Sequence, residues 1–265
     1  MIGFIGCGNM GGALATAAAK ALPAGEILLA NRTRAKADAL AAQLGACVSS
    51  NEEIARTCHY IFLGVKPQMM QDLMQTLRPI LAERQDRFIL VSMAAGLTAR
   101  TIQEMAGSPY PIIRILPNTP AGVGKGVTQF CTLSVTEDEK QEFLRIMAPS
   151  GLLDELPESL MNAANCLSGC GTAFACLFME ALADGAVACG LPRQTANRYA
   201  AQTLVGMGTL ALESGEPFGL LKDRVCSPGG TTIQGVRALE RGGLRSAAME
   251  AVIAAFEKTQ KLGGA

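Results

Sequence analysis

The chain has 265 residues with 23 basic and 23 acidic side chains, and it is 49% hydrophobic but only 5% aromatic. That length allows one or two domains with a sizeable core. The net charge of zero offers no basic surface for nucleic acid, and the scarcity of aromatic side chains disfavours binding of single-stranded bases. The composition, rich in Ala, Gly and Leu, is typical of an α/β protein without a nucleic-acid partner.

Cysteine usage and the N-terminus predict a cytoplasmic protein. Nine cysteines are scattered without a C-x-x-C pair, and His59 is the single histidine. This pattern predicts reduced thiols and no bound metal. The glycine motif described below begins almost at once, which leaves no room for a signal peptide. The longest apolar segment, residues 166–179, is too short to span a bilayer, so we expect a buried helix and no membrane contact.

Up to residue 157, apolar strands alternate with helical segments. Near-continuous apolar runs predict strands at residues 1–5, 26–30, 60–65, 88–93 and 111–116, with further strands at 126–135 and 152–156. Helical periodicity marks the segments 10–22, 33–44 and 67–81. Because strands buried on both faces are apolar throughout, the pattern predicts a Rossmann-type doubly wound, mostly parallel sheet over residues 1–157.

From residue 158 the strand signals almost disappear. Pro192 stands where a new helix can begin, residues 215–219 interrupt the helical pattern, and the last helical run covers 242–262. We therefore predict an all-helical domain over residues 158–265. Many of its helices are apolar on more than one face, so we expect a homodimer or larger homo-oligomer formed through this domain. The alternative is an unusually apolar monomer.

The first strand runs into a G-x-G-x-x-G motif that opens a helix, which is typical of dinucleotide-binding sites. In this motif Gly6 permits a tight turn, Gly8 lets backbone amides approach a pyrophosphate, and Gly11 allows close helix–strand packing. The first helical turn, with Asn9 and Met10, then faces the phosphates with free N–H groups. A glycine-rich turn without a ligand is the alternative.

About twenty residues after the glycine loop, where NAD-selective sites usually place an acid, the chain reads "NRTR". A carboxylate there would repel a 2′-phosphate, whereas Arg32 or Arg34 attracts one. Asn31 and Thr33 can donate further hydrogen bonds. These residues predict NADPH as the cofactor, with NADH used less well. The alternative is that the arginines form a solvated helix start.

Three loops follow strands that end at the edge of the sheet where ligands bind in open α/β folds. They carry the candidate cofactor contacts Val65, Lys66, Pro67, Ala94, Ala95, Gly96 and Asn118. Their place beside the glycine loop favours contact with the cofactor, although ordinary turns between strands and helices are the alternative.

A second candidate anion site lies in the helical region, at "SPGGTT" (residues 227–232). This stretch cannot be a helix interior, so a turn is predicted, and a helix follows from about Thr231. Exposed amides that lead into a helix N-terminus suit a carboxylate. The alternative is a helix start capped by a threonine side chain.

The motifs "GFIGCGNMG", "GVKPQ", "RILPNTPAGVGKG" and "LLKDRVCSPGGTTIQGVRALE" stand in this order along essentially the whole chain. In these motifs the chain resembles the pyrroline-5-carboxylate reductase family. The resemblance implies NAD(P)H-dependent reduction of 1-pyrroline-5-carboxylate to L-proline, the last step of proline biosynthesis. It also implies a helical domain that interlocks with that of a partner subunit, with the substrate held between this domain and the cofactor domain.

The resemblance further implies the roles of single residues. The substrate carboxylate would be received by the backbone of Ser227, Gly229, Gly230 and Thr231. Thr232, the candidate catalytic residue, would hydrogen-bond the ring nitrogen. The nicotinamide would be lined by Lys66, Pro67, Ala94, Ala95 and Gly96, and the 2′-phosphate held by Asn31, Arg32 and Thr33.

A protonated cyclic imine already accepts hydride readily, so the enzyme mainly supplies orientation. Two other functions stay open from the residues. A β-hydroxyacid dehydrogenase would need a catalytic lysine in the helical domain, where Lys222 is the only lysine between Lys140 and Lys258. A non-catalytic NADP-binding sensor would have no use for the turn at residues 227–230.

Overall fold

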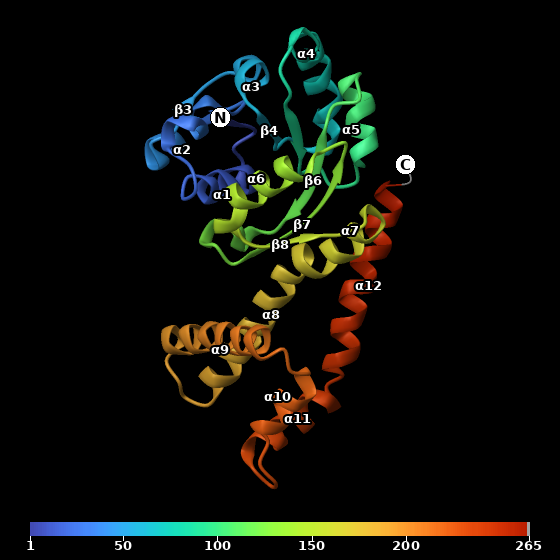
Figure 1. The fold of residues 1–265 in the computed structure, drawn as a ribbon. Coiled ribbons are helices and arrows are strands. Elements are labelled where there is room, and N and C mark those ends of the chain that lie inside the picture. Colours follow the sequence, from blue (N-terminus) through green and yellow to red (C-terminus); the bar gives the residue numbers. More distant parts are fainter. Residues whose placement is uncertain (264–265) are drawn as a thin grey trace. The chain divides into compact units, whose positions relative to one another are not determined.

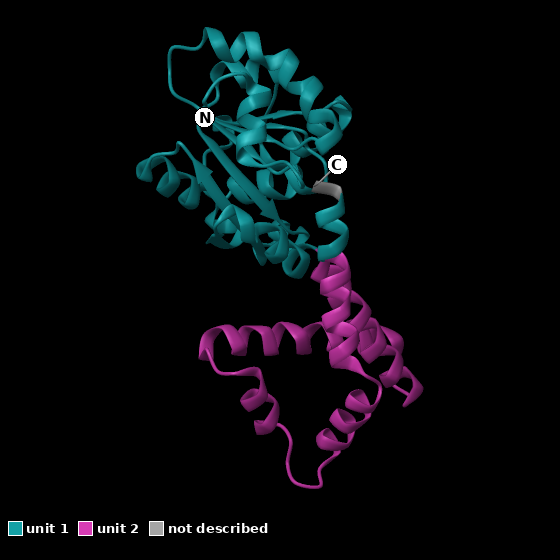
Figure 2. Ribbon diagram, turned by 90° about the vertical axis from the view of Figure 1, so that its right-hand side faces the viewer, with its two compact units in different colours: residues 1–169, 256–265 teal, residues 170–255 magenta. Residues whose placement is uncertain are grey.

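The computed structural model describes residues 1–263 of the chain, and the side chains of residues 1–261. The chain forms two compact units (Figure 2). The first contains residues 1–169 together with the end of the chain from Phe256, and the second contains residues 170–255. The first unit thus extends past residue 157, and the predicted domain boundary at that residue stays a prediction.

The first unit is built on one eight-stranded sheet with the order β3-β2-β1-β4-β5-β6-β7-β8 (Figure 1). Its strands are β1 (Ile2–Ile5), β2 (Ile27–Ala30), β3 (Cys47–Val48), β4 (Tyr60–Leu63), β5 (Ile89–Ser92), β6 (Ile112–Pro117), β7 (Gly126–Leu133) and β8 (Gly151–Glu155). All neighbouring strands are parallel except β6 and β7. The predicted mostly parallel Rossmann-type sheet is confirmed, and β3 is the strand that the sequence did not predict.

Helices cover both faces of the sheet (Figure 1). One face carries α1 (Asn9–Ala18), α2 (Arg34–Leu44) and α6 (Glu137–Met147), and the other carries α3 (Asn51–Thr57), α4 (Met70–Glu83) and α5 (Ala99–Ala106). Phe4 and Phe62 stack in the first core with ring centroids 4.4 Å apart, while Ile61 and Leu63 belong to the second. Successive residues of the central strands therefore enter two cores, which explains their continuous apolar runs.

Short 3₁₀ turns complete the first unit. They are η1 (Ala24–Glu26), η2 (Pro67–Met69), η3 (Thr119–Val123) and η4 (Ala148–Ser150). The helix predicted from residue 67 begins with the 3₁₀ turn η2. Pro67 is the first residue of this turn, a position where no N–H has to be donated within the helix. The helix predicted over 10–22 ends earlier, at Ala18.

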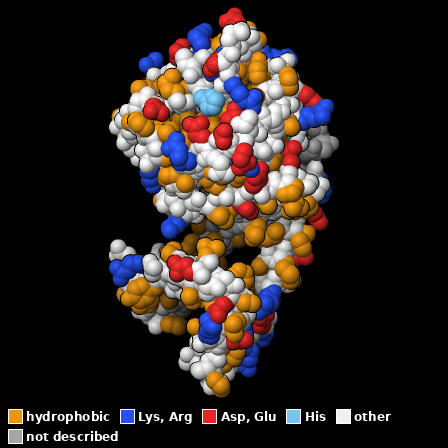
Figure 3. All heavy atoms as spheres, viewed as in Figure 1, with side chains coloured by type: hydrophobic (Ala, Val, Ile, Leu, Met, Phe, Trp, Pro, Cys, Tyr) orange, Lys and Arg blue, Asp and Glu red, His pale blue; other side chains and the backbone are white. Residues whose placement is uncertain are grey.

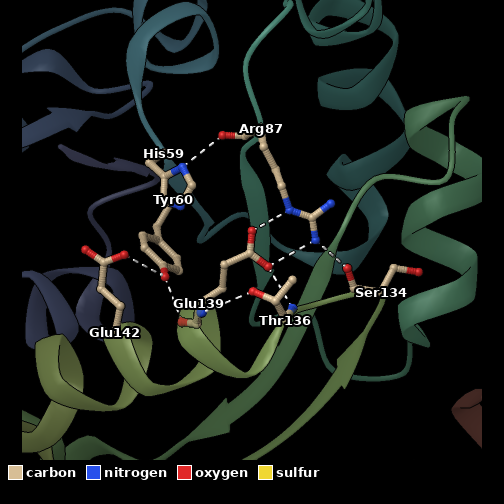
Figure 4. Close-up of polar contacts among 7 residues, drawn as sticks. All are labelled: His59, Tyr60, Arg87, Ser134, Thr136, Glu139 and Glu142. Carbon is tan, nitrogen blue, oxygen red and sulfur yellow. Dashed lines mark hydrogen bonds and ion pairs between the residues drawn. The ribbon is translucent and has the colours of Figure 1, made fainter.

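A polar cluster fixes α6 to the edge of the sheet where β4 and β5 begin (Figure 4). The Tyr60 hydroxyl donates to the Glu139 carbonyl oxygen at 2.7 Å, and the Arg87 guanidinium donates to both Glu139 carboxylate oxygens at 2.5 and 3.0 Å. Glu139 and Thr136 also form a capping box at the start of α6. Burial opposes ionisation of Glu139, but hydrogen bonds from Arg87 and Thr136 outweigh it and lower its pKa to about 2.

The rest of the described chain is helical, as predicted. The helices are α7 (Glu158–Asn165), a π turn (Cys166–Cys170), α8 (Gly171–Ala188), α9 (Arg193–Ser214), α10 (Phe218–Arg224), α11 (Thr231–Arg241) and α12 (Leu244–Gly263). Pro192 is the N-cap of α9, so the helix predicted to begin there is confirmed.

One helical run, Glu158–Ala188, is long and apolar enough by length and composition to cross a membrane, yet only 11% of its most apolar stretch is buried within the chain. Residues 166–179 are one part of this longer helical run, and among them only Cys166 is buried, so the expectation of a buried helix is wrong for the chain by itself. The π turn joins α7 to α8 without a break, which lengthens the run. Figure 3 shows hydrophobic side chains on the surface of the helical unit. Leu177 and Leu212 are among the exposed large hydrophobic residues of this unit.

Candidate active site

The glycine loop has the geometry that its three glycines predict. Gly6 has φ +101°, and a Cβ at this position would lie 2.5 Å from the carbonyl oxygen of Gly64. A Cβ at Gly11 would lie 2.1 Å from the Gly6 carbonyl oxygen, so α1 packs directly on the turn. A Cβ at Gly8 would meet nothing within 4 Å. Gly8 is also the N-cap of α1 and has no side chain to cap the first amides, which are thus available to an anion.

The loop after β2 is tied to the glycine loop by Asn31. Its Oδ1 accepts from the Cys7 backbone N–H at 3.1 Å, and its Nδ2 donates to the Thr33 carbonyl oxygen at 3.0 Å. The side-chain amide expected to donate to the cofactor is therefore already engaged on both sides. Asn31 holds two phosphate-binding candidates, the glycine loop and the loop with Arg32, in a fixed relation.

A cleft of about 680 Å³ opens along this edge of the sheet. It brings together seven of the predicted cofactor residues, namely Gly6, Gly8, Asn31, Arg32, Thr33, Val65 and Lys66. Arg34 does not line it and instead pairs with Asp38 at 3.7 Å. The structure therefore favours Arg32 of the two arginines that the sequence left open.

Three cationic side chains line the cleft. Arg32 and Lys66 are joined there by Lys36, which the sequence analysis missed, and none of the three has an ion-pair partner among the described residues. Lys36 lies in the first turn of α2, whereas Arg32 precedes the N-cap of that helix, so no helical spacing links the two. Asn51, at the start of α3, is a second missed residue on the cleft wall. Unpaired cations of this kind suit an anionic ligand.

Other predicted cofactor residues lie outside the lining of this cleft. Asn9 lines an adjoining cleft of about 400 Å³ that also contains Lys36. Met10 and Gly11 belong to the first turn of α1, and Pro67 begins η2. The remaining members follow β5 and β6, and are Ala94, which is buried, Ala95 and Gly96, which are exposed, and Asn118, which is buried.

The buried amide of Asn118 has partners within the protein. Its Nδ2 donates to the Ser168 carbonyl oxygen at 2.9 Å, and its Oδ1 accepts from the Val127 backbone N–H at 2.8 Å. These bonds join the end of β6 to β7 and to the π turn. They give Asn118 a structural task in addition to its place at the predicted cofactor edge.

The second candidate anion site is a tight turn before α11. The Gly230 N–H donates to the Ser227 carbonyl oxygen at 3.0 Å, with Pro228 and Gly229 (φ +69°) between them, which is the geometry of a type II turn. Gly230 is the N-cap of α11 and no side chain caps this helix. The alternative of a threonine cap is therefore wrong. Thr231 and Thr232 are exposed in the first turn of α11, in the second compact unit.

Both halves of the chain match known protein families. Residues 158–262 match the pyrroline-5-carboxylate reductase dimerisation model, and residues 1–96 match a model of NADP oxidoreductases that are coenzyme F420-dependent. A pyrroline-5-carboxylate reductase of Danio rerio is 40% identical over 265 residues, covering 99% of this chain and 91% of the relative. The chain belongs to the pyrroline-5-carboxylate reductase family. The reductase of Escherichia coli K12 is 39% identical, covering 98% of this chain and 97% of that protein.

Solved structures of the family share the whole fold. The pyrroline carboxylate reductase of Plasmodium falciparum, with NADP bound, is 33% identical, has a TM-score of 0.85, and covers 99% of this chain and 97% of that one. The reductase of Coxiella burnetii is 32% identical with a TM-score of 0.88, covering 98% and 97%. An imine reductase of Streptomyces aurantiacus, 22% identical with a TM-score of 0.55, shares the fold alone. Membership of the reductase family sets aside the β-hydroxyacid dehydrogenase and the non-catalytic sensor.

Proposed function

We propose that the chain reduces 1-pyrroline-5-carboxylate to L-proline with NADPH, as a cytoplasmic homo-oligomeric enzyme of proline biosynthesis. The observation that carries the proposal is the near-full-length similarity to reductases of this name. Each compact unit adds an anion site of the expected kind. The first unit has a cleft with unpaired cations, and the second has an amide turn without a capping side chain.

The residues of the cleft fit a dinucleotide that carries a 2′-phosphate. Gly8 leaves open space beside the free amides of α1, and the end of β2 carries no carboxylate. Arg32 and Lys36 would hold the 2′-phosphate, and Lys66 would lie beside the nicotinamide half. NADPH supplies the hydride when bound. The NADP bound in the Plasmodium falciparum relative supports this choice.

The turn at residues 227–230 would hold the substrate by its carboxylate. Backbone amides at the start of α11 can bind an anion without an ionisable side chain. They would therefore orient the substrate without exchanging a proton with it. The Thr232 hydroxyl, one residue into the helix, would hydrogen-bond the ring nitrogen. Because the protonated imine accepts hydride readily, orientation of the ring carries most of the catalytic task.

Homo-oligomerisation explains the exposed apolar surface of the helical unit. Leu177 and Leu212 are 65% and 84% exposed in the single chain, and the helical region is the part that matches the family's dimerisation model. A partner subunit would cover this surface, including the run Glu158–Ala188. A cytoplasmic location agrees with the buried thiols of Cys7, Cys58 and Cys131, whose pKa values burial raises to about 11.

The test is NADPH oxidation with 1-pyrroline-5-carboxylate, compared with 1-piperideine-2-carboxylate and a simple 2-ketoacid. We expect turnover with the five-membered imine and little with the ketoacid. Thr232→Ala should lower kcat/KM for the imine and leave NADPH affinity nearly unchanged, whereas Thr57→Ala, a surface hydroxyl of the first unit that bonds the Glu53 carbonyl oxygen, should change neither. Oxidation of a 3-hydroxyacid as the sole activity would contradict the proposal.

A further inference from the structure

The residues that line the cofactor cleft include one carboxylate. Of the residues that line the cleft, Asp72 is the single acid. It lies in the first turn of α4 and is exposed. Among the described residues its carboxylate has neither an ion pair nor a hydrogen bond, since Thr76 donates to the Asp72 backbone carbonyl oxygen instead. The carboxylate is therefore available to a ligand.

Asp72 belongs to a regular face that α4 turns toward the cleft. The lining residues of this segment are Met69, Asp72, Leu73 and Thr76, at intervals of three, one and three residues. This is the spacing of one side of a helix. The face thus offers a carboxylate and a hydroxyl-bearing residue next to two apolar side chains.

The other walls of the cleft are accounted for by the proposed cofactor. The glycine loop takes the pyrophosphate, Arg32 and Lys36 take the 2′-phosphate, and the loop with Lys66 takes the nicotinamide half. The base of the adenosine half is then the part of the dinucleotide without an assigned partner. Apart from Asn51, the face of α4 is the main part of the cleft wall without an assigned ligand group.

Adenine matches this face chemically. Its plane is apolar enough to lie against Met69 and Leu73, and its exocyclic amino group is a hydrogen-bond donor. An ionised carboxylate only accepts hydrogen bonds, and the first turn of a helix stabilises its negative charge. We propose that Asp72 accepts a hydrogen bond from the adenine amino group and so selects adenine dinucleotides over those that carry hypoxanthine. This inference rests on the proposed use of NADPH.

The discriminating probe is reduced nicotinamide hypoxanthine dinucleotide phosphate, in which a carbonyl replaces the amino group. A carbonyl oxygen facing the Asp72 carboxylate finds no donor, whereas the amide of Asp72→Asn can accept from adenine or donate to hypoxanthine. Affinities are measured on the full-length oligomer by dihydronicotinamide fluorescence, which no tryptophan obscures in this chain. We expect the wild type to bind NADPH about tenfold more tightly than the hypoxanthine analogue, and Asp72→Asn to reduce that ratio below about threefold.

Asp38→Asn is the matched control, because it makes the same chemical change on α2, pairs with Arg34 and does not line the cleft. The ratio of its affinities for NADPH and for the hypoxanthine analogue, the base ratio, should equal that of the wild type. An unchanged ratio in Asp72→Asn overturns the inference, as does a gain in NADPH over NADH affinity without a change in the base ratio. Imine reduction by the same wild-type preparation tests the proposed function separately. Failure to bind NADPH at all would overturn both.

Discussion

The cluster around Glu139 makes the stability of the first unit depend on pH in a calculable way. Glu139→Gln keeps the size of the side chain but removes the charge that Arg87 and Thr136 stabilise. The pKa of Glu139 is about 2 against an ordinary value of 4.5. A lowering of 4.5 − 2, about 2.5, corresponds to about 3 kcal/mol of folding free energy at about 1.4 kcal/mol per pKa unit. Glu139 is only 9% exposed, but its partner Arg87 is half exposed, so about 3 kcal/mol is the upper limit of this contribution.

The sign follows from the direction of the pKa. A carboxyl with a lowered folded-state pKa contributes its stability above its ordinary pKa and loses it as the pH falls toward the folded-state value. The wild type should therefore exceed Glu139→Gln in unfolding free energy at pH 7, by up to about 3 kcal/mol. That difference should shrink steadily between about pH 4.5 and about pH 2.

The assay is urea unfolding of both proteins across this pH range, at one fixed protein concentration because the oligomer couples folding to association. Glu137→Gln serves as the control, since this residue lies in the same helical turn but is exposed, and its removal should cost little at any pH. A stability difference between the wild type and Glu139→Gln that is the same at pH 7 and pH 3 would refute the reasoning.

Three further changes probe the proposed site. Arg32→Ala should lower kcat/KM for NADPH about 10- to 100-fold and affect NADH much less, because a charge-assisted contact to the 2′-phosphate is lost; equal losses with both cofactors would contradict that contact. Asn31→Asp removes the donor to the Thr33 carbonyl oxygen and adds a carboxylate to the cleft, so the ratio of kcat/KM values should move toward NADH. Arg224→Gln breaks the two-pronged ion pair with Glu216 (2.5 and 2.6 Å), which joins the last residue of α10 to the residue before its N-cap, shortly before the substrate turn. We expect a several-fold higher KM for the imine with unchanged NADPH affinity, and a loss confined to kcat would argue against a positioning role.

The parts of the fold that follow from local chemistry could be predicted from the sequence. Strands buried on both faces are visible in the sequence as continuous apolar runs such as residues 60–63. Gly6 marked the turn because its positive φ is a conformation that favours glycine. β3 was missed because its two residues, of which Cys47 is exposed and Val48 is half-buried, make no apolar run. The type II turn before α11 could be predicted because proline followed by glycine permits few other conformations.

Features that depend on residues far apart in the chain could not be predicted. The partners of Asn118 include Ser168, fifty positions away, and no local pattern links the two. Lys36 required knowledge of which face α2 turns toward the cleft. The apolar character of residues 166–179 was plain, but composition does not say whether the same chain or another copy covers an apolar surface.

The division of the chain into units has a consequence for how the protein is made. Residues 170–255 are inserted between two parts of the first unit, which is completed by the segment from Phe256 onward. A ribosome therefore makes the last piece of that unit only after the whole inserted unit has been synthesised. The sheet can assemble early, but its final helical contacts, such as that of Cys166 with Thr259 at 3.7 Å, can form only after the inserted residues 170–255 have been synthesised.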